Sequence, residues 1–233
     1  SIRNDDPLAV LYIDLDRFKM INDSYGHFVG DELLSQIAIR LKKNLRSVDI
    51  VGRLSGDEFA IILPECSHQQ AQLMIEELQI HLAEPMNINN SILKMSASIG
   101  VAMFPTDGRD IETLLHRADI AMDQAKNNGR SQFCFFSHEM NELLQSHLKL
   151  ENDLRHALLN HQLHLHYQPQ IDLVTGSLYG VEALARWTHP EFGEISPERF
   201  IPIAEECGLI TEFGYWVIQE SCRSEERRVG KEC

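Results

Sequence analysis

The fold of this chain is decided by residues 8–16, which read Leu-Ala-Val-Leu-Tyr-Ile-Asp-Leu-Asp, an apolar run ending in two acids. An apolar run of this length is typical of a buried strand, so Asp14 is expected at the carboxyl end of a strand. A second stretch, residues 53–59, reads Arg-Leu-Ser-Gly-Asp-Glu-Phe. Its Gly56 and Asp57 separate two short apolar segments, which indicates a β-hairpin. Carboxylates are therefore expected both at a strand end and in a turn.

The segments between and after these two stretches alternate between helical and strand patterns. Apolar residues recur at helical spacing over residues 33–45, 71–82 and 111–125, and the third helix is expected to stop near 127–129. Residues 95–101 alternate apolar with small or polar side chains, which predicts a half-buried strand, and residues 133–136 add a last short strand. This order predicts an α/β or α+β sandwich in which helices cover a sheet.

Composition limits the classes of function. The chain has 233 residues, 43% of them hydrophobic, and a net charge of −14. An acidic surface repels phosphate backbones, so binding to a nucleic acid polymer is not expected. No apolar run is long enough to cross a membrane, and the five cysteines lack metal-site spacing and indicate free thiols in the cytoplasm.

The acids at the strand end and in the turn suit one kind of chemistry. Nucleotidyl transfer on a nucleoside triphosphate needs hard oxygen ligands for Mg²⁺ or Mn²⁺, and carboxylates provide them. Taken alone, Asp14 and Asp57 are also compatible with a purely structural role, because acids at strand ends commonly form turns or caps.

Three blocks of sequence change this balance. These blocks resemble the GGDEF domain of diguanylate cyclases. They are Asp14-Leu15-Asp16-Arg17-Phe18-Lys19 with the polar residues and glycines that follow to residue 31, then Arg53–Phe59, and then Ala118–Arg130. The resemblance covers about residues 8 to 136. It implies an adenylyl-cyclase-like palm fold, and condensation of two GTP molecules to cyclic-di-GMP by two domains facing each other in a homodimer.

The resemblance also implies roles for individual residues. Asp14, Glu58 and the carbonyl of Leu15 would bind the metal, with Asp57 as a second ligand or an aid to deprotonating the 3′-hydroxyl, so that Asp57 and Glu58 are the catalytic pair. The residues implied to bind GTP are Lys19, Asn22, Asp31, Gly56, Lys126 and Arg130. Without the family, Asn22 and Asp31 would be read as caps, and the two cations at 126 and 130 as partners of a helix dipole.

Two features depart from the family's usual pattern, and a third resembles a regulatory site of the family. Ser55 stands where the family usually has the first glycine of its signature, and serine is less suited to a positive φ, so weaker cyclase activity is expected. The Arg46-Ser47-Val48-Asp49 segment resembles the family's inhibitory site for cyclic-di-GMP, although an ordinary surface pair of Arg46 and Asp49 is the alternative. The segment that usually precedes the first strand is missing, so the domain is expected to be truncated at its N-terminus.

A second unit begins near residue 161. Three of its segments resemble the start of an EAL phosphodiesterase domain: Tyr167–Gln170, Glu182–Trp187 and the segment from His189 to Ile210. The resemblance implies an α/β barrel that hydrolyses cyclic-di-GMP to pGpG. The resemblance implies Glu182 as a metal ligand and Gln168, Leu184 and Arg186 as ligand contacts. A salt bridge between Glu182 and Arg186 is the alternative. A complete barrel needs roughly 250 residues, so this portion is expected to be incomplete and inactive.

The expected organisation is therefore a GGDEF domain over residues 1–136, a connecting helix over 137–160 and the start of an EAL domain over 161–222. Residues 223–233 can be back-translated into a common sequencing-adapter sequence and are expected to be a non-native tail. The leading hypothesis is a cytoplasmic cyclase within a tandem GGDEF–EAL protein, with or without a membrane tether in segments outside this chain. The alternative is a silent module that binds GTP or cyclic-di-GMP and controls the EAL domain.

Overall fold

The computed structural model of the chain describes residues 6–89, 91–160 and 162–229, with side chains described up to Arg223. It divides into two compact units, residues 1–141 and 142–233. Nowhere in the described residues does a helix reach the length and hydropathy that crossing a bilayer demands. Four cysteines, at positions 66, 134, 207 and 222, are free thiols, and Cys233 lies outside the described residues.

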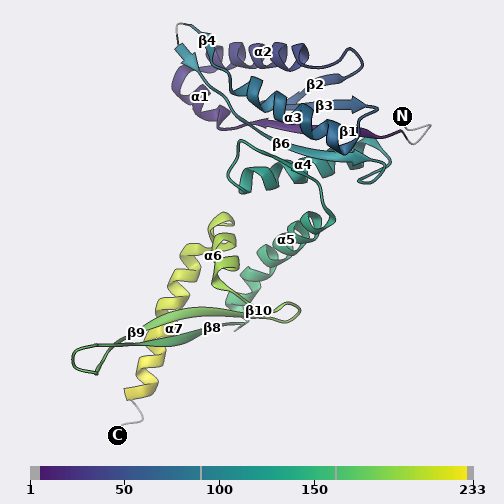
Figure 1. Ribbon diagram of the computed structural model, residues 1–233. Helices are drawn as coiled ribbons and strands as arrows, with labels where there is room; N and C mark the ends of the chain where they lie inside the picture. Colours follow the sequence, from purple (N-terminus) through teal and green to yellow (C-terminus); the bar gives the residue numbers. More distant parts are fainter. Residues whose placement is uncertain (1–5, 90, 161, 230–233) are drawn as a thin grey trace. The chain divides into compact units, whose positions relative to one another are not determined.

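The first unit is built on a five-stranded sheet in the order β2-β3-β1-β6-β7 (Figure 1). The strands are β1 (Leu8–Leu15), β2 (Ile50–Ser55), β3 (Glu58–Pro64), β6 (Ala97–Phe104) and β7 (Phe133–Phe135). Neighbouring strands are antiparallel except for β6 and β7, which are parallel. Because the predicted strand of residues 8–13 is the central strand, its carboxyl end delivers Asp14 to the middle of the sheet edge.

Helices cover both faces of this sheet. They are α1 (Phe18–Tyr25), α2 (His27–Lys43), α3 (His68–Ala83) and α4 (Ile111–Asn127), and a small hairpin of β4 (Met86–Ile88) and β5 (Ser91–Leu93) follows α3. Ala9, Leu11 and Ile13 of β1 pack with the core that α2 and α3 form, whereas Val10 packs with residues of α4. This layered arrangement confirms the predicted α+β sandwich.

Local sequence sets where these helices begin and end. Ser67 and Gln70 form a capping box at the start of α3, and the Asp110 carboxylate accepts the Thr113 amide hydrogen at 2.8 Å at the start of α4. Helix α4 ends at Asn127, as the Asn-Asn-Gly sequence predicted.

The prediction of a half-buried strand over residues 95–101 is wrong. Strand β6 starts at Ala97 and every one of its residues is buried, because it lies between β1 and β7 with helices on both faces. Ser98 and Gly100, which the pattern placed towards solvent, face α4 on the same side as Asp14 and Tyr12. The missing side chain of Gly100 lets α4 approach the sheet closely, and the Ser98 hydroxyl donates a hydrogen bond within the protein rather than to solvent.

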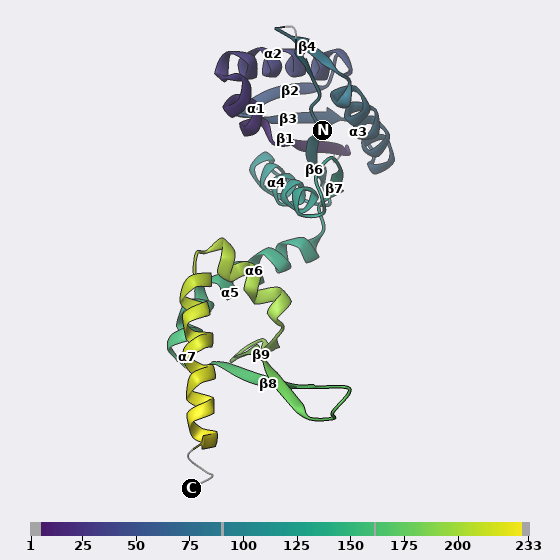
Figure 2. The same ribbon diagram turned by 90° about the vertical axis from the view of Figure 1, so that its left-hand side faces the viewer.

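The second unit has an open three-stranded sheet in the order β10-β9-β8, packed against helices. Its elements are α5 (His138–Leu159), β8 (Leu163–Ile171), β9 (Leu178–His189), β10 (Gly193–Ile195), α6 (Pro197–Glu206) and α7 (Ile210–Val229). Trp187 and Phe200 are fully buried at its core, and the tip of the β8–β9 hairpin projects beyond the helices of this unit (Figure 2). The described residues form three strands here, which confirms an incomplete barrel.

Helix α5 occupies the predicted connecting region and packs against the second unit. Leu150, Leu154 and Ala157 of this helix are buried in the core of the second unit, so the helix has an apolar face as well as a polar one. The division between the units at residue 141 falls inside the helix. The backbone of α7 continues to Val229, so the non-native origin of residues 223–233 stays a prediction, and residues 230–233 lie outside the described ones.

Candidate functional site

Two carboxylates face each other where β1 and β3 end. Asp14 is paired directly with Glu58 in the antiparallel register, so both side chains lie on the face of the sheet that α4 covers. Lys126 of α4 places its Nζ 2.9 Å from Oδ2 of Asp14. Tyr12, two residues before Asp14 on the same face, lies close enough to Glu58 for that carboxylate to raise the pKa of the Tyr12 hydroxyl. Sheet and helix therefore bring together acids that are 44 residues apart in sequence with a lysine from a third segment.

The turn between β2 and β3 closes over this strand end. The Leu15 amide donates to the Asp57 carbonyl at 3.3 Å, which ties the turn to the end of β1. The negative charge of Asp57 contributes to raising the pKa of Asp14, so the two carboxylates lie close enough to repel each other. Asp14, Leu15, Asp57 and Glu58 are thus neighbours at one end of the sheet, and their metal-binding and catalytic roles stay a prediction.

Negative charge exceeds positive charge in this cluster. Burial raises the pKa of Asp14, partly offset by Lys126. Burial also raises the pKa of Asp119 on α4, with further contributions from the charges of Asp123 and Glu58. Burial and the charge of Glu58 raise the pKa of Tyr12 to about 12. The site therefore disfavours its own charges unless a cation is added.

Asp14 and Glu58 supply oxygen donors of the kind that divalent cations bind together with water and substrate. The described residues contain no group of three or more His, Cys, Asp or Glu side chains arranged to hold a metal. Mg²⁺ commonly takes one or two carboxylates and completes its octahedron with water and substrate phosphates. Asp14 and Glu58, with the carbonyl of Leu15 between their strands, match that requirement.

We expect Asp119→Asn to stabilise the first unit at neutral pH by roughly 0.5 kcal/mol, the scale of substitutions outside the core. Because the pKa of Asp119 is raised in the folded protein, its carboxylate is destabilising above that pKa. The gain should therefore be present at about pH 7 and vanish at about pH 2.5, well below the unfolded pKa of about 3.9, where the carboxyl is protonated in both states. Thermal unfolding at both pH values measures it, with the exposed Asp23→Asn on α1 as control. An equal gain at both pH values would contradict the electrostatic cause.

Ser55 behaves differently from the expectation at the signature. The positive φ of this turn, 37°, falls on Gly56, and Ser55 is not among the residues with positive φ. Backbone strain at Ser55 is therefore not a reason for reduced activity. Instead, the Ser55 hydroxyl donates a hydrogen bond to Oε2 of Glu58. The effect of this serine is on the carboxylate rather than on the backbone.

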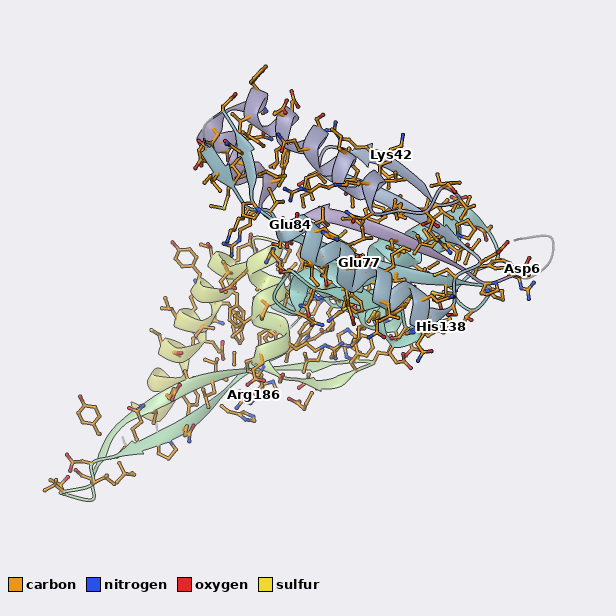
Figure 3. The ribbon with its side chains drawn as sticks, turned by 45° about the horizontal axis from the view of Figure 1, so that its top comes forward. Asp6, Lys42, Glu77, Glu84, His138 and Arg186 are labelled. Atoms are coloured by element: carbon orange, nitrogen blue, oxygen red, sulfur yellow. The ribbon has the colours of Figure 1, made fainter. Side chains whose placement is uncertain are left out.

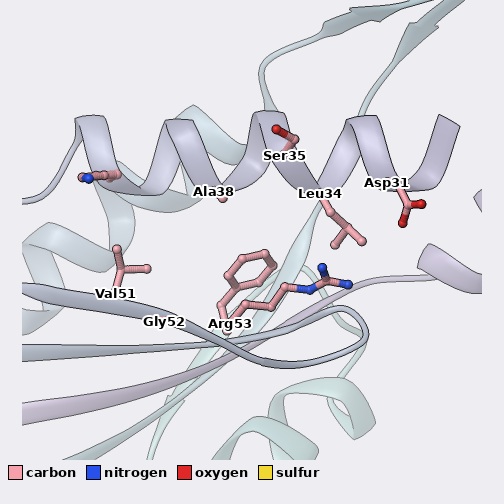
Figure 4. Close-up of a pocket in the computed structure, with 9 residues that line it drawn as sticks. Asp31, Leu34, Ser35, Ala38, Val51, Gly52 and Arg53 are labelled. Atoms are coloured by element: carbon pink, nitrogen blue, oxygen red, sulfur yellow. The ribbon is translucent and has the colours of Figure 1, made fainter. Parts of the chain in front are cut away.

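Asp31 lines a hollow on the other face of the sheet. This α2–β2 hollow, about 440 Å³ in volume, lies between helix α2 and strand β2 (Figure 4) and is lined by Asp31, Leu34, Ser35, Ala38, Lys42, Val51, Gly52, Arg53 and Phe59. The Arg53 side chain runs along it towards Asp31 (Figure 4), and its Nε donates to the Gly56 carbonyl at 2.8 Å. Arg53 thus connects the hollow to the turn that carries Asp57 and Glu58.

The other predicted GTP-binding residues surround the same end of the sheet. Asn22 of α1 packs against Gly30 of α2, and its buried Oδ1 has no hydrogen-bond partner. Lys19 is exposed on α1, and Arg130 is exposed just after α4 with a φ of 64°. Arg130 lines a second hollow of about 360 Å³, the Arg130 hollow, which it shares with Arg17 and Lys94.

The predicted inhibitory pair is formed within the chain. Arg46 Nη2 lies 2.7 Å from Oδ1 of Asp49, and the Arg46 amide donates to Oδ2 of the same carboxylate at 2.8 Å. The guanidinium also donates to the Pro64 carbonyl at 3.0 Å. The Asp49 side chain has no exposed surface. A ligand at this position would have to use the remaining face of Arg46.

In the second unit, the predicted ligand residues share one face of a hairpin. Glu182 of β9 is paired directly with Gln168 of β8, and Leu184 and Arg186 follow at alternate positions of β9. Figure 3 labels Arg186 on this hairpin. Within the described residues, no ion pair joins Glu182 to Arg186, and Arg186 donates to the Ala185 carbonyl at 2.8 Å. The core residues Leu163 and Trp187 lie on the opposite face, so the predicted contacts remain available.

Three residues of the first site were missed from the sequence. Asp119 lies within a helix whose pattern gave only its apolar face, and Tyr12 was counted as part of an apolar run. Asp16 was noted only as the second acid of the motif, but it is 8% exposed and hydrogen-bonded to β6 and to the segment after α4. Their polar character in otherwise apolar surroundings was the available signal.

Residues 1–132 match the family model described as diguanylate cyclase, GGDEF domain. The chain belongs to the GGDEF family. Solved structures agree with this: the GGDEF domain of YfiN (TpbB) from Pseudomonas aeruginosa is 39% identical, with a TM-score of 0.57, over 58% of this chain and 85% of that one. The active GGEEF domain of a diguanylate cyclase from Vibrio cholerae is 31% identical, with a TM-score of 0.54, over 58% and 86% of the two chains.

Residues 151–231 match the EAL domain model, so the GGDEF domain is followed by part of an EAL domain. The bifunctional diguanylate cyclase/cyclic di-GMP phosphodiesterase MucR of Pseudomonas aeruginosa is 45% identical over 96% of this chain. These findings confirm the tandem GGDEF–EAL organisation. The chain spans about a third of the length of MucR, 33%, and similar or smaller shares of the other curated relatives.

Proposed function

We propose that the GGDEF domain of this chain condenses two GTP molecules into cyclic-di-GMP. In each of two equivalent steps, the 3′-oxygen of one GTP attacks the α-phosphorus of the other. A new P–O bond forms, the bond to the β-phosphate breaks, and pyrophosphate leaves. The observation that carries the proposal is the direct pairing of Asp14 with Glu58, with Lys126 2.9 Å from Asp14.

The carboxylates prepare the site for substrate with its metal. Asp14, Glu58 and the Leu15 carbonyl would hold Mg²⁺ or Mn²⁺, which supplies charge neutralisation at the phosphates and acidifies the attacking hydroxyl. Lys126 neutralises the negative charge of Asp14 in the absence of a metal. Once a cation binds to Asp14, the lysine would be free to bind a phosphate oxygen. Asp57, whose charge already acts on Asp14, would receive the proton of the 3′-hydroxyl.

The rest of the nucleotide spans the end of the sheet. The α2–β2 hollow has the size of a nucleobase site, and its Asp31 can accept from the N1–H and N2–H₂ donors of guanine. Asn22 carries a buried oxygen without a partner at the neighbouring α1–α2 contact, which supports a role in holding the base. Gly56 leaves the turn open to the ribose or phosphates, and Lys19 and Arg130 would pair with the triphosphate.

One domain holds one GTP, so the reaction requires a homodimer with two such sites facing each other. Arg46 and Asp49 are proposed to bind the product cyclic-di-GMP and restrain the cyclase, with the guanidinium gripping phosphate. For the whole protein, we propose that Glu182, Gln168, Leu184 and Arg186 belong to an EAL site that hydrolyses cyclic-di-GMP. GTP as substrate places the protein in the cytoplasm.

Incubation of the purified chain with GTP and Mg²⁺, followed by separation of the nucleotides, tests the proposal. Cyclic-di-GMP and pyrophosphate in a ratio of one to two are expected. A folded sample that binds GTP without forming product would refute the cyclase and support the silent regulatory module instead. A folded sample that does not bind GTP would contradict both.

Replacing Ser55 by glycine or alanine should lower the Mg²⁺ concentration needed for half-maximal product formation by about threefold to tenfold. The Ser55 hydroxyl now donates to Oε2 of Glu58, and a typical intramolecular hydrogen bond contributes about 0.5–1.5 kcal/mol net, which is about twofold to tenfold in a binding constant. Alanine removes the hydroxyl and keeps Cβ, so equal effects of the two variants would assign the change to the hydroxyl. An unchanged or higher Mg²⁺ requirement for both would show that this hydrogen bond does not compete with the metal.

A further inference from the structure

The carboxylate of Asp16 is fully engaged by hydrogen-bond donors. Its Oδ1 accepts from the Ser98 hydroxyl and its Oδ2 from the Ser96 hydroxyl, both at 2.7 Å. Oδ2 also accepts the backbone N–H of Ser131 at 3.0 Å. The residue as a whole is buried, with 8% of its surface exposed. Asp16 is therefore not available as a metal ligand in this arrangement, unlike its neighbour Asp14.

The Ser131 contact holds a segment of unusual backbone. Gly129, Arg130 and Ser131 have φ values of 119°, 64° and 53°, three consecutive residues in a region that only glycine adopts readily. The Arg130 amide donates to the Ala125 carbonyl at 3.1 Å, which fixes the segment at the α4 side. Asp16 fixes its other end, through the only backbone donor that Ser131 has.

This segment carries one of three cations around the Arg130 hollow. Arg17 directly follows Asp16, Lys94 precedes Ser96 by two residues, and Arg130 directly precedes Ser131. The three side chains line a space of about 360 Å³. Asp16 is thus bonded to, or adjacent to, each of the segments that bring these cations together. Asp16 itself lines the hollow, but its carboxylate oxygens accept from Ser96, Ser98 and Ser131 rather than from the three cations.

We infer that Asp16 is a positioning residue that fixes the backbone of Gly129–Ser131, and through it the Arg130 side chain, for the terminal phosphates of the nucleotide. The inference rests on the proposed function, since it concerns the same GTP. It assigns the second acid of the Asp-Leu-Asp motif a different task from the first: Asp14 faces Glu58 and Lys126, whereas Asp16 binds to β6 and to the segment after α4.

Asp16→Ala tests this inference through a comparison of ligands. The variant should bind GTP at least about tenfold more weakly than the wild type and bind GMP, which lacks the terminal phosphates, within about twofold. Asp16→Asn keeps an acceptor oxygen for Ser131 and should lose less GTP affinity than Asp16→Ala. Asp107→Ala is the matched control, because Asp107 is also 8% exposed and accepts a backbone N–H, that of Met103 at 2.7 Å, away from the site. It should alter neither affinity.

Equal losses for GTP and GMP, or the same pattern in Asp107→Ala, would overturn the inference, because both indicate a general loss of structure. Hydrogen exchange provides a readout that needs no ligand: the Ser131 amide should exchange faster in Asp16→Asn than in the wild type, because a neutral amide oxygen is a weaker acceptor than a carboxylate, and an unchanged rate would also overturn it. This second readout applies even if Asp16→Ala does not fold. A wild-type chain that fails to bind GTP contradicts the proposed function, while the exchange at Ser131 still decides the role of Asp16.

Discussion

Gly100→Ala is expected to unfold the first unit. A Cβ on Gly100 would lie 1.8 Å from the Ala118 carbonyl oxygen and 2.2 Å from the Met122 amide nitrogen. Both are backbone atoms of α4, so no side-chain rotation relieves the overlap, and the helix would have to move away from the sheet. A loss of more than about 4 kcal/mol is expected, which is most of the stability of a domain of this size. Circular dichroism and urea unfolding of the variant measure it.

Gly52→Ala is the matched control, because Gly52 is also a strand glycine but has no atom within 4 Å of its Cβ position. That variant should unfold within about 0.5 kcal/mol of the wild type. If Gly100→Ala unfolded as the control does, the close packing of α4 on β6 would be wrong. The position of Lys126 and Asp119 relative to Asp14 and Glu58 depends on that packing, so the candidate site would be wrong with it.

The sequence was sufficient wherever local pattern and chemistry agreed. The apolar run before Asp14 predicted a buried strand, and the Gly-Asp turn predicted the hairpin that brings Glu58 opposite Asp14. Helical spacing located α2, α3 and α4 to within a few residues. In each case one short window holds the information, because hydrophobic periodicity and turn residues act locally.

The features that the sequence did not predict depend on packing between segments that are distant in the chain. Ser98 and Gly100 alternate with apolar residues with the same period whether the small residues face water or a helix. The sequence pattern therefore could not show that α4 packs on this face of β6. Helix α1, only eight residues long, has too few apolar positions to give a periodic signal. The hydrogen bonds of Asp16 join residues 80 and more positions apart, and no local pattern predicts them.

Glu58→Gln is expected to reduce cyclic-di-GMP formation by more than about a hundredfold. Loss of a residue that only supports a metal ligand typically costs ten- to a hundredfold, so loss of a ligand carboxylate should cost more. The same substitution removes one of the charges that act on Tyr12 and Asp119, so the folded state should become slightly more stable in the absence of metal. Product formation and thermal unfolding, measured on the same sample, therefore should change in opposite directions.

That opposition separates a catalytic role from a structural one. Replacing a residue that only stabilised the fold would lower activity and stability together. A ligand carboxylate in a cluster with excess negative charge destabilises the fold instead, so replacing it would lower activity and raise stability. Glu76→Gln on the exposed face of α3 is the control and should change neither quantity. If Glu58→Gln kept its turnover, the pairing of Asp14 with Glu58 could not be the catalytic centre, and the cyclase assignment would lose the observation on which it rests.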